Sequence, residues 1–309
     1  MQYITGTRDF ALEDRTAVTL GKFDGVHRGH QKLLQEVFRF RSQGLKAAVF
    51  TFATAPGSLI SGRPMTMITT NEERRRILED MGVDYLVEYP FNQEVASMEP
   101  EAFVAEVLCR RMRAGAVVTG TDFHFGHRRA GDIHLLHELA PKYGYTPVTV
   151  EKISDGERII SSTYIREELA AGRIRKANEL LGHPYSITGT VVHGQHLGTT
   201  LGFPTVNILP PPEKHLPIFG VYLSETVVDG IVYDSLTNIG RKPTIAGEHP
   251  VSVETYIYDL NRDLYGKEIH VRMIDFFRPE IRFDSLQELQ ERVTLDKEQG
   301  RLVHLMRKH

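Results

Sequence analysis

Two histidines three residues apart, His27 and His30, follow a short apolar run that ends at Gly21. They stand at the start of a predicted helix, so both imidazoles fall on one side of its first turn. Unpaired backbone N–H groups and the positive end of the helix dipole attract anions there, and Gly29 lets a ligand approach the backbone. The segment predicts a polyphosphate site, although two capping or surface histidines would produce the same pattern.

A second polar segment offers hydroxyl groups and a guanidinium. Ser161, Ser162 and Thr163 precede Arg166, whose planar fork suits phosphate oxygens. The same residues also make a good helix start, so the segment taken alone is compatible with a purely structural role.

A third segment follows a predicted strand that ends at Gly120. Asp122 could contact ribose or a metal there, and Phe123 could line a flavin or adenine pocket. A polar turn is the alternative for Asp122, and core packing is the more common role for Phe123 and Phe125.

The second half of the chain carries its own set of polar residues. Thr205 and Asn207 present hard oxygens with one residue between them, a donor type that suits Mg²⁺ and phosphate. Gly194 and Gly198, a few residues upstream, predict a loop.

Glu254 lies within an alternating apolar segment, where a carboxylate costs stability unless it is paired or used. It could act as a general base that accepts the proton of an attacking hydroxyl. Alternation places Glu254 on the same face as Tyr256 and Tyr258, so an outward-facing Glu254 on a half-exposed strand is equally compatible with the pattern.

Alternating strand-like and helix-like segments must position the first set of residues. Strands are predicted at 17–20, 47–52, 83–88, 117–120 and 145–150, and helices at 31–40, 71–81 and 100–113. This alternation predicts a parallel sheet covered by helices, with ligands beyond the carboxyl ends of the strands.

After residue 181 the pattern changes to short β-rich segments, at 185–192, 221–228, 231–236, 251–258 and 268–277. Asp229 and Gly230 form a hairpin signal, and a final helix over 285–306 begins at a capping Ser285. This pattern predicts an antiparallel barrel with a terminal helix. The expected domains are 1–182 and 183–309.

Composition excludes several classes of protein. Lys and Arg number 37 against 40 Asp and Glu, a net charge of −3, which argues against general nucleic-acid binding. Cys109 is the only cysteine, so no internal disulfide and no cysteine-based metal site can form. No apolar run reaches the roughly 18 residues of a membrane span, and the N-terminus lacks a secretory signal. A cytoplasmic location is expected.

Several motifs, in the right order over essentially the whole chain, resemble one family. GKFDGVHRGH, GTDFHFG and ISSTYIR are similar to adenylyltransferase motifs. LGFPTVN, NIGRKPT, VETYIYDL, DLYGK and RPEIRFDS are similar to kinase motifs. Together they resemble the prokaryotic bifunctional riboflavin kinase/FMN adenylyltransferase family.

The resemblance implies a fold and two reactions. A Rossmann-like nucleotidyltransferase α/β domain would precede an antiparallel β-barrel riboflavin kinase domain. The barrel would phosphorylate riboflavin to FMN with ATP and Mg²⁺, and the α/β domain would adenylylate FMN to FAD with release of pyrophosphate. The expected partners are these small molecules, without nucleic acid or membrane, and oligomerisation stays open.

The resemblance also assigns residues to these reactions. Catalytic roles fall to Glu254, His27, His30 and Arg166. ATP and phosphates would be bound by Gly21, Phe23, Asp24, Gly29, Ser161, Ser162, Thr163, Gly194, Gly198, Thr205 and Asn207, with Thr205 and Asn207 also holding the metal. Flavin would be bound by Asp122, Phe123, Phe125 and Arg278.

Two positions depart from the family pattern. Residues 51–56 read TFATAP, where the family usually has a Pro-x-Pro stretch with a histidine between the prolines. Thr199 stands where an arginine is usual. The alternatives are a chain that retains only one activity and a non-catalytic, flavin-responsive regulatory protein. An RNA-linked relative is disfavoured by the net charge.

Overall fold

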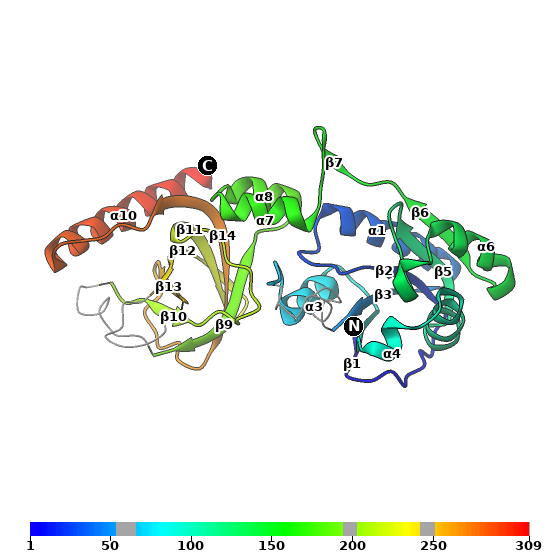
Figure 1. Ribbon diagram of the computed structural model, residues 1–309. Helices are drawn as coiled ribbons and strands as arrows, with labels where there is room; N and C mark the ends of the chain where they lie inside the picture. Colours follow the sequence, from blue (N-terminus) through cyan, green and yellow to red (C-terminus); the bar gives the residue numbers. More distant parts are fainter. Residues whose placement is uncertain (54–65, 194–202, 242–250, 309) are drawn as a thin grey trace. The chain divides into compact units, whose positions relative to one another are not determined.

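The computed structural model describes residues 1–53, 66–193, 203–241 and 251–308. Contacts within the chain divide it into two compact units, Met1–Ser162 and Thr163–His309. Figure 1 labels the elements of each unit. None of the described helices combines the length and the apolar character that a membrane span requires.

The first unit is built on a parallel sheet, six-stranded within the described residues, in the order β1-β4-β3-β2-β5-β6. The strands are β1 (Gln2–Thr5), β2 (Thr16–Leu20), β3 (Lys46–Phe52), β4 (Tyr85–Tyr89), β5 (Ala114–Gly120) and β6 (Thr146–Val150). From β2 the sheet extends one way to β3 and the other way to β5, so the strand order reverses beside β2. Such a reversal is the position where open parallel sheets bind ligands.

Helices cover both faces of this sheet. They are α1 (Arg28–Arg39), α3 (Asn71–Asp80), α4 (Gln93–Ala96), α5 (Pro100–Ala102) and α6 (Ile133–Tyr143), with 3₁₀ turns η1 (Phe40–Gln43) and η3 (His127–Arg129). The predicted helix at 100–113 is largely a π-helical segment, η2 (Phe103–Arg111). Successive strand residues point to opposite faces, so Ala17 packs with Val37 of α1 whereas Val18 packs with Val107 of η2.

The second unit begins with helices α7 (Ser162–Ala170) and α8 (Ile174–Leu181) after a small hairpin, β7 (Ser154–Asp155) and β8 (Arg158–Ile159). Asn178 of α8 donates to the Met273 carbonyl at 2.9 Å and accepts from the Tyr185 backbone N–H at 2.7 Å. Contacts of this kind group both helices with the barrel. The functional division at residue 182 stays a prediction.

The rest of the second unit is a closed antiparallel barrel in the order β10-β13-β12-β11-β14-β9. Its strands are β9 (Ser186–Val192), β10 (Val206–Ile208), β11 (Gly220–Val228), β12 (Ile231–Arg241), β13 (Val251–Ile257) and β14 (Glu268–Pro279). The hairpin between β11 and β12 turns at Asp229 (φ 50°) and Gly230 (φ 80°), as predicted. The predicted combination of a parallel α/β unit and an antiparallel barrel is confirmed.

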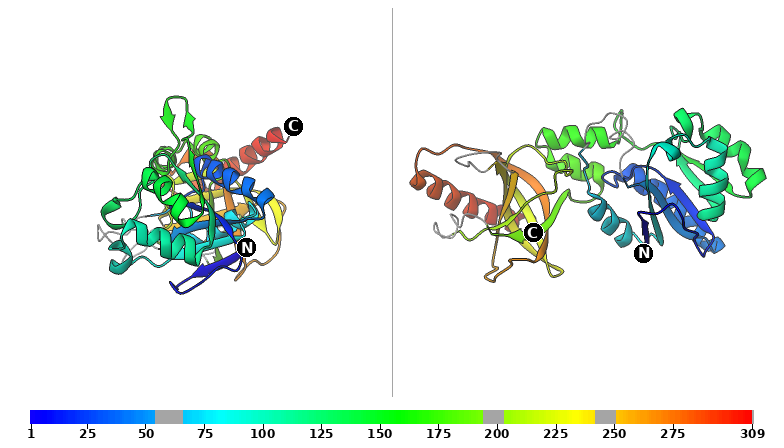
Figure 2. Two further views of the ribbon diagram at one scale, coloured as in Figure 1. Left: turned by 90° about the vertical axis from the view of Figure 1, so that its right-hand side faces the viewer. Right: turned by 60° about the horizontal axis from the view of Figure 1, so that its bottom comes forward.

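The terminal helix α10 (Leu286–Arg307) lies along the barrel (Figures 1 and 2). Ser285 caps it by accepting from the Glu288 backbone N–H at 3.1 Å. On the barrel wall, Val221, Leu223, Leu236 and Tyr258 form the apolar cluster against which Val303 packs. The predicted terminal helix is confirmed.

Candidate functional sites

The loop between β2 and α1 lies at the carboxyl end of β2, where the strand order reverses. Phe23 (φ 49°) and Val26 (φ 41°) take the left-handed backbone conformation in this loop. Each such non-glycine residue costs about 1–3 kcal/mol, and this kind of strain is typical of ligand-binding sites.

The two histidines of this loop lie together as predicted. Their ring centroids are 3.8 Å apart, and Phe23 stacks on His30 at 4.7 Å. A Cβ atom at Gly29 would lie 3.1 Å from His27 Nδ1, so this close packing favours glycine. His27 makes no side-chain capping bond to α1, which leaves the first-turn N–H groups for an anion.

His30 is chemically distinctive. Burial lowers its pKa well below the usual value, and the charges of His27 and Arg74 act in the same direction. Its Nδ1 atom is buried without a hydrogen-bond partner among the described residues. His30 is therefore a neutral imidazole at neutral pH, with one ring nitrogen left for a ligand.

The hydroxyl segment adjoins this loop. Ser162 Oγ donates to the Asp24 carbonyl at 2.9 Å, across 138 residues of sequence. The Ile160 carbonyl lies 3.9 Å from the position that a Cβ of Gly29 would occupy. Within the first unit, the structure thus brings Ser162 of the hydroxyl segment together with the histidine loop. Thr163 and Arg166 lie on α7, and their phosphate-binding roles stay predictions.

Asp24 has a positioning role in the structure. Its Oδ1 atom accepts from the backbone N–H groups of Ile68 at 2.7 Å and Thr69 at 3.3 Å. Thr69 Oγ1 in turn accepts from the Gly25 backbone N–H at 3.0 Å. These bonds tie the histidine loop to the segment that leads into α3.

A buried ion pair between Arg74 of α3 and Glu88 of β4 was not among the predicted site residues. Both side chains are nearly fully buried. Arg74 Nη1 also donates to the Lys22 carbonyl at 3.2 Å, and this bond ties α3 to the histidine loop. A carboxylate in the otherwise apolar segment YLVEY was the sequence signal that could have revealed this pair.

The third predicted segment follows β5, which pairs with β2. Asp122 is bound by Lys152 at 2.7 Å, and this contact lowers the pKa of the Asp122 carboxyl. Phe123 and Phe125 stack with centroids 5.7 Å apart. Phe125 is a core residue, as the packing alternative describes, whereas Phe123 is only half-buried. The flavin-binding roles of these residues stay predictions.

Barrel register brings the second set of residues into one row. Asn207 of β10 pairs with Glu254 of β13, and Glu254 pairs with Asn238 of β12. Asn238 pairs with Val221 of β11, which pairs with Arg278 of β14. Directly opposed residues share a face of the sheet. Three predicted site residues, Asn207, Glu254 and Arg278, therefore lie on one face.

This row opens into a cavity of about 260 Å³ between the barrel wall and α10. Its polar lining includes Thr205, Asn238, Glu254, Arg278, Asp296 and Lys297, and its aromatic lining is Phe203, Tyr256 and Phe283. An apolar cavity with a few converging polar groups is typical of small-molecule sites. Glu254 faces this cavity, which favours a functional role over a purely outward-facing one.

Arg278 does not face the cavity as an isolated charge. Its Nε and Nη2 atoms lie 2.8 Å and 2.6 Å from Asp296 Oδ2 of α10. The two side chains are 12% and 5% exposed. Neither Asp296 nor its neighbour Lys297 could be identified from sequence, because no residue pattern along 285–306 marks one helical face as facing a site.

The β10 end of the row carries hard oxygen ligands that suit Mg²⁺. Thr205 offers a hydroxyl and Asn207 an amide oxygen, and Glu254 lies directly opposite Asn207. No group of three or more His, Cys, Asp and Glu that could hold a metal occurs among the described residues. Mg²⁺ commonly takes its remaining ligands from water and substrate phosphates, so the donor set fits this ion.

Some predicted residues lie outside the described part of the chain. They are Gly194, Gly198 and Thr199 of the glycine loop and residues 54–56 of TFATAP.

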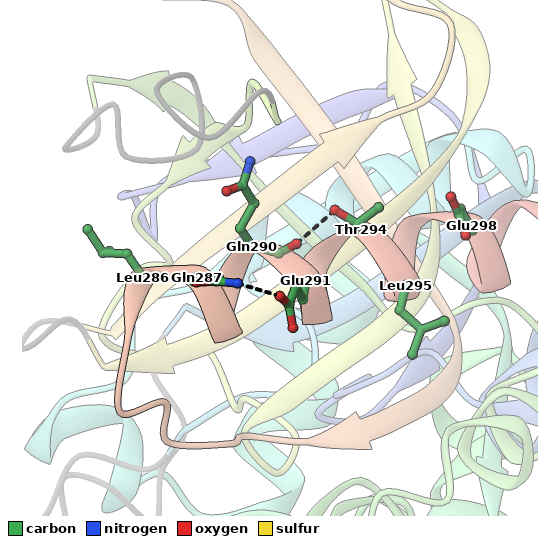
Figure 3. Close-up of a pocket in the computed structure, with 7 residues that line it drawn as sticks. All are labelled: Leu286, Gln287, Gln290, Glu291, Thr294, Leu295 and Glu298. Carbon is green, nitrogen blue, oxygen red and sulfur yellow. Dashed lines mark hydrogen bonds between the residues drawn. The ribbon is translucent and has the colours of Figure 1, made fainter.

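A larger hollow, of about 770 Å³, lies on the outer face of α10 (Figure 3). It is lined by residues of this helix alone, with Gln287 bonded to Glu291 at 3.0 Å and Thr294 bonded to the Gln290 carbonyl at 2.8 Å. No predicted site residue lines it, so the smaller cavity is the better candidate.

Comparison with known proteins matches two family models to two successive parts of the chain. The FAD synthetase family model matches residues 10–164, and the riboflavin kinase family model matches residues 181–304. A bifunctional riboflavin kinase/FMN adenylyltransferase of Escherichia coli (strain K12) is 35% identical over 302 residues, 96% of each chain. The Bacillus subtilis (strain 168) protein of the same description is 35% identical over 293 residues, 93% of this chain and 92% of that protein.

A solved structure also resembles the whole chain. It is described as a macrolide-efflux protein from Streptococcus pneumoniae and is 30% identical, with a TM-score of 0.84. The match covers 97% of this chain and 98% of that chain. The efflux description concerns that protein, and the similarity supports the arrangement of elements described above.

Proposed function

The chain belongs to the bifunctional riboflavin kinase/FMN adenylyltransferase family, and we propose on that premise how its residues perform two reactions. The protein phosphorylates riboflavin to FMN with ATP, and it adenylylates FMN to FAD with release of pyrophosphate. Its substrates are riboflavin, FMN and ATP. We assign the kinase to residues 183–309 and the adenylyltransferase to residues 1–182.

The observation that carries the kinase assignment is the row Asn207–Glu254–Asn238 beside the cavity. Glu254 accepts the proton of the riboflavin 5′-hydroxyl as that oxygen attacks the γ-phosphorus of ATP. Thr205 and Asn207 would hold Mg²⁺ through their side-chain oxygens, and phosphate through that ion. A Mg²⁺ ion held by these oxygens would supply positive charge to offset the charge on the transferred phosphoryl group. Apolar and aromatic walls of the cavity suit a flat flavin ring.

The adenylyltransferase assignment rests on the neutral His30, its neighbour His27 and the uncapped start of α1. Backbone N–H groups and imidazole N–H groups bind the ATP phosphates in this arrangement. Ser162 lies beside them through its bond to the Asp24 carbonyl. No covalent enzyme intermediate is needed, so positioning and charge stabilisation carry the catalysis.

Product analysis tests the whole assignment. Purified protein with riboflavin, ATP and Mg²⁺ should form FMN and then FAD, separated by chromatography. FMN without FAD would favour a kinase-only protein. A reaction that forms neither FMN nor FAD would contradict the proposal and would favour the flavin-responsive regulator. The expected cytoplasmic location and the absence of nucleic-acid partners stay predictions.

A further inference from the structure

Lys297 of α10 lines the cavity between the barrel wall and this helix, and its ammonium group has an unusual environment. Its Nζ atom lies 5.0 Å from the ring centroid of Tyr256 and 5.6 Å from that of Phe203. Over the described residues, this ammonium makes no hydrogen bond and no ion pair. A cation over two aromatic faces gains attraction from the rings but keeps its hydrogen-bond donors for another group.

The other cations of the same helix are all paired. Arg292 lies 2.9 Å from Asp296, Arg301 lies 3.0 Å from Asp259, and Arg307 lies 3.7 Å from Glu225. Lys297 is therefore the exception among the Lys and Arg residues of α10, and it is the one whose side chain lines the cavity together with Arg278.

The backbone that carries Lys297 is held firmly on both sides. Tyr258 Oη donates to the Lys297 carbonyl at 2.7 Å, and Arg278 holds the side chain of the preceding residue, Asp296. A close approach at Gly300 fixes the next turn, where a Cβ would lie 2.8 Å from Tyr258 Oη. Because the backbone is already fixed, only the rotamers of the Lys297 side chain have to be ordered when its ammonium binds a ligand.

We propose that the Lys297 ammonium donates a hydrogen bond to a carbonyl oxygen on the pyrimidine ring of the flavin, and so acts as a flavin-recognition residue of the kinase. This inference rests on the proposed kinase function. Flat ring faces of Tyr256 and Phe203 surround the ammonium and suit a heterocycle. The oxygen ligands that suit Mg²⁺, and phosphate through that ion, are instead those of Thr205 and Asn207.

Charge in the cavity favours the same ligand. Its lining carries three carboxylates, Glu254, Glu280 and Asp296, against the cations Arg278 and Lys297. Asp296 already neutralises Arg278. The lining therefore carries more carboxylates than cations, so a second anionic group beside Lys297 would cost more than the uncharged flavin ring with its carbonyl acceptor.

The test uses lumiflavin, a flavin ring that carries neither the ribityl chain nor a phosphate. Lys297→Met keeps the apolar stem over the rings and removes the charge. We expect it to weaken lumiflavin binding in fluorescence titrations about tenfold to a hundredfold, the usual effect of losing a charged hydrogen bond. The riboflavin KM should rise by a similar factor with kcat unchanged, and Lys297→Arg should restore part of the affinity.

Lys308→Met is the matched control, because Lys308 follows the same helix but pairs with Asp234 at 2.7 Å and does not line the cavity. It should leave lumiflavin binding unchanged. Unaltered lumiflavin binding in Lys297→Met, or a fall in kcat without a change in binding, would overturn the inference. Absence of FMN from the wild-type reaction would instead refute the kinase function, while the lumiflavin titration still reports on Lys297.

Discussion

Glu254 is the residue whose replacement separates the two activities. It stands opposite Asn207 and Asn238 at the barrel cavity, and the first unit holds none of these residues. Glu254→Gln keeps the shape and removes the base, so FMN formation should fall by about a hundredfold to ten-thousandfold. Formation of FAD from supplied FMN should persist. Chromatography of both products is the measurement, and parallel loss of both activities would refute the assignment.

His30 supports the opposite separation. His30→Ala removes the neutral imidazole that stacks on His27 and Phe23. We expect FAD formation from FMN to be lost while riboflavin is still phosphorylated at the wild-type rate. An undiminished FAD yield in this variant would reject a phosphate role for the histidine pair. His134→Ala, at an exposed histidine of the same unit outside the predicted site residues, is the control.

The same histidine makes stability depend on pH. Burial holds the pKa of His30 well below its usual 6.5, so the folded protein stays unprotonated there while the unfolded chain takes up a proton. This contribution to stability is complete above pH 6.5 and is lost as the pH falls toward the folded-state pKa. When the pH is lowered from 7 to 5, the melting temperature of His30→Gln should therefore fall less than that of the wild type. Circular dichroism measures both melting temperatures. An equal loss in both proteins would contradict this.

Among the elements, α10 depends on a close approach to the barrel. A Cβ at Gly300 would lie 2.9 Å from both Leu236 methyl groups. Gly300→Ala gains about 1 kcal/mol of helix propensity, but overpacking costs about 1–3 kcal/mol. We expect a net loss of up to about 2 kcal/mol in denaturant unfolding and a raised riboflavin KM. Gln299→Ala, at an exposed neighbour, should change neither, and a stabilised Gly300→Ala protein would refute the packing argument.

Elements with local signals were predictable, and elements defined by distant contacts were not. The Asp229–Gly230 hairpin and the Ser285 cap follow from residue type at a fixed spacing, and both occur as predicted. The edge strand β1 was missed because it is set by its pairing with β4, in which Gln2 lies opposite Tyr85, 83 residues further along the chain.

The candidate sites follow the same division. The His27–His30 pair could be predicted because one helical turn contains both residues. The Arg74–Glu88 pair and the Arg278–Asp296 pair join separate elements, and no local pattern connects their members. Glu254 could be named from sequence, but only strand register shows that Asn207 and Asn238 flank it.

For the molecule as a whole, the two reactions are proposed to take place at separate sites. The only link they need is FMN, which the kinase releases and the adenylyltransferase binds. The Glu254→Gln protein lacks the first reaction and the His30→Ala protein lacks the second. Neither alone should make FAD from riboflavin, but an equimolar mixture should, because FMN released by one protein reaches the intact adenylyltransferase site of the other.

Chromatography of the mixture over time reads this directly, and FMN should accumulate before FAD appears. The yield should rise when FMN is added at the start, since the second step depends on its free concentration. A mixture that makes FMN but never FAD, although Glu254→Gln alone converts supplied FMN, would show that the product does not leave the kinase site freely. The two units would then have to work within one chain, and the independence inferred from their separate cores would be wrong.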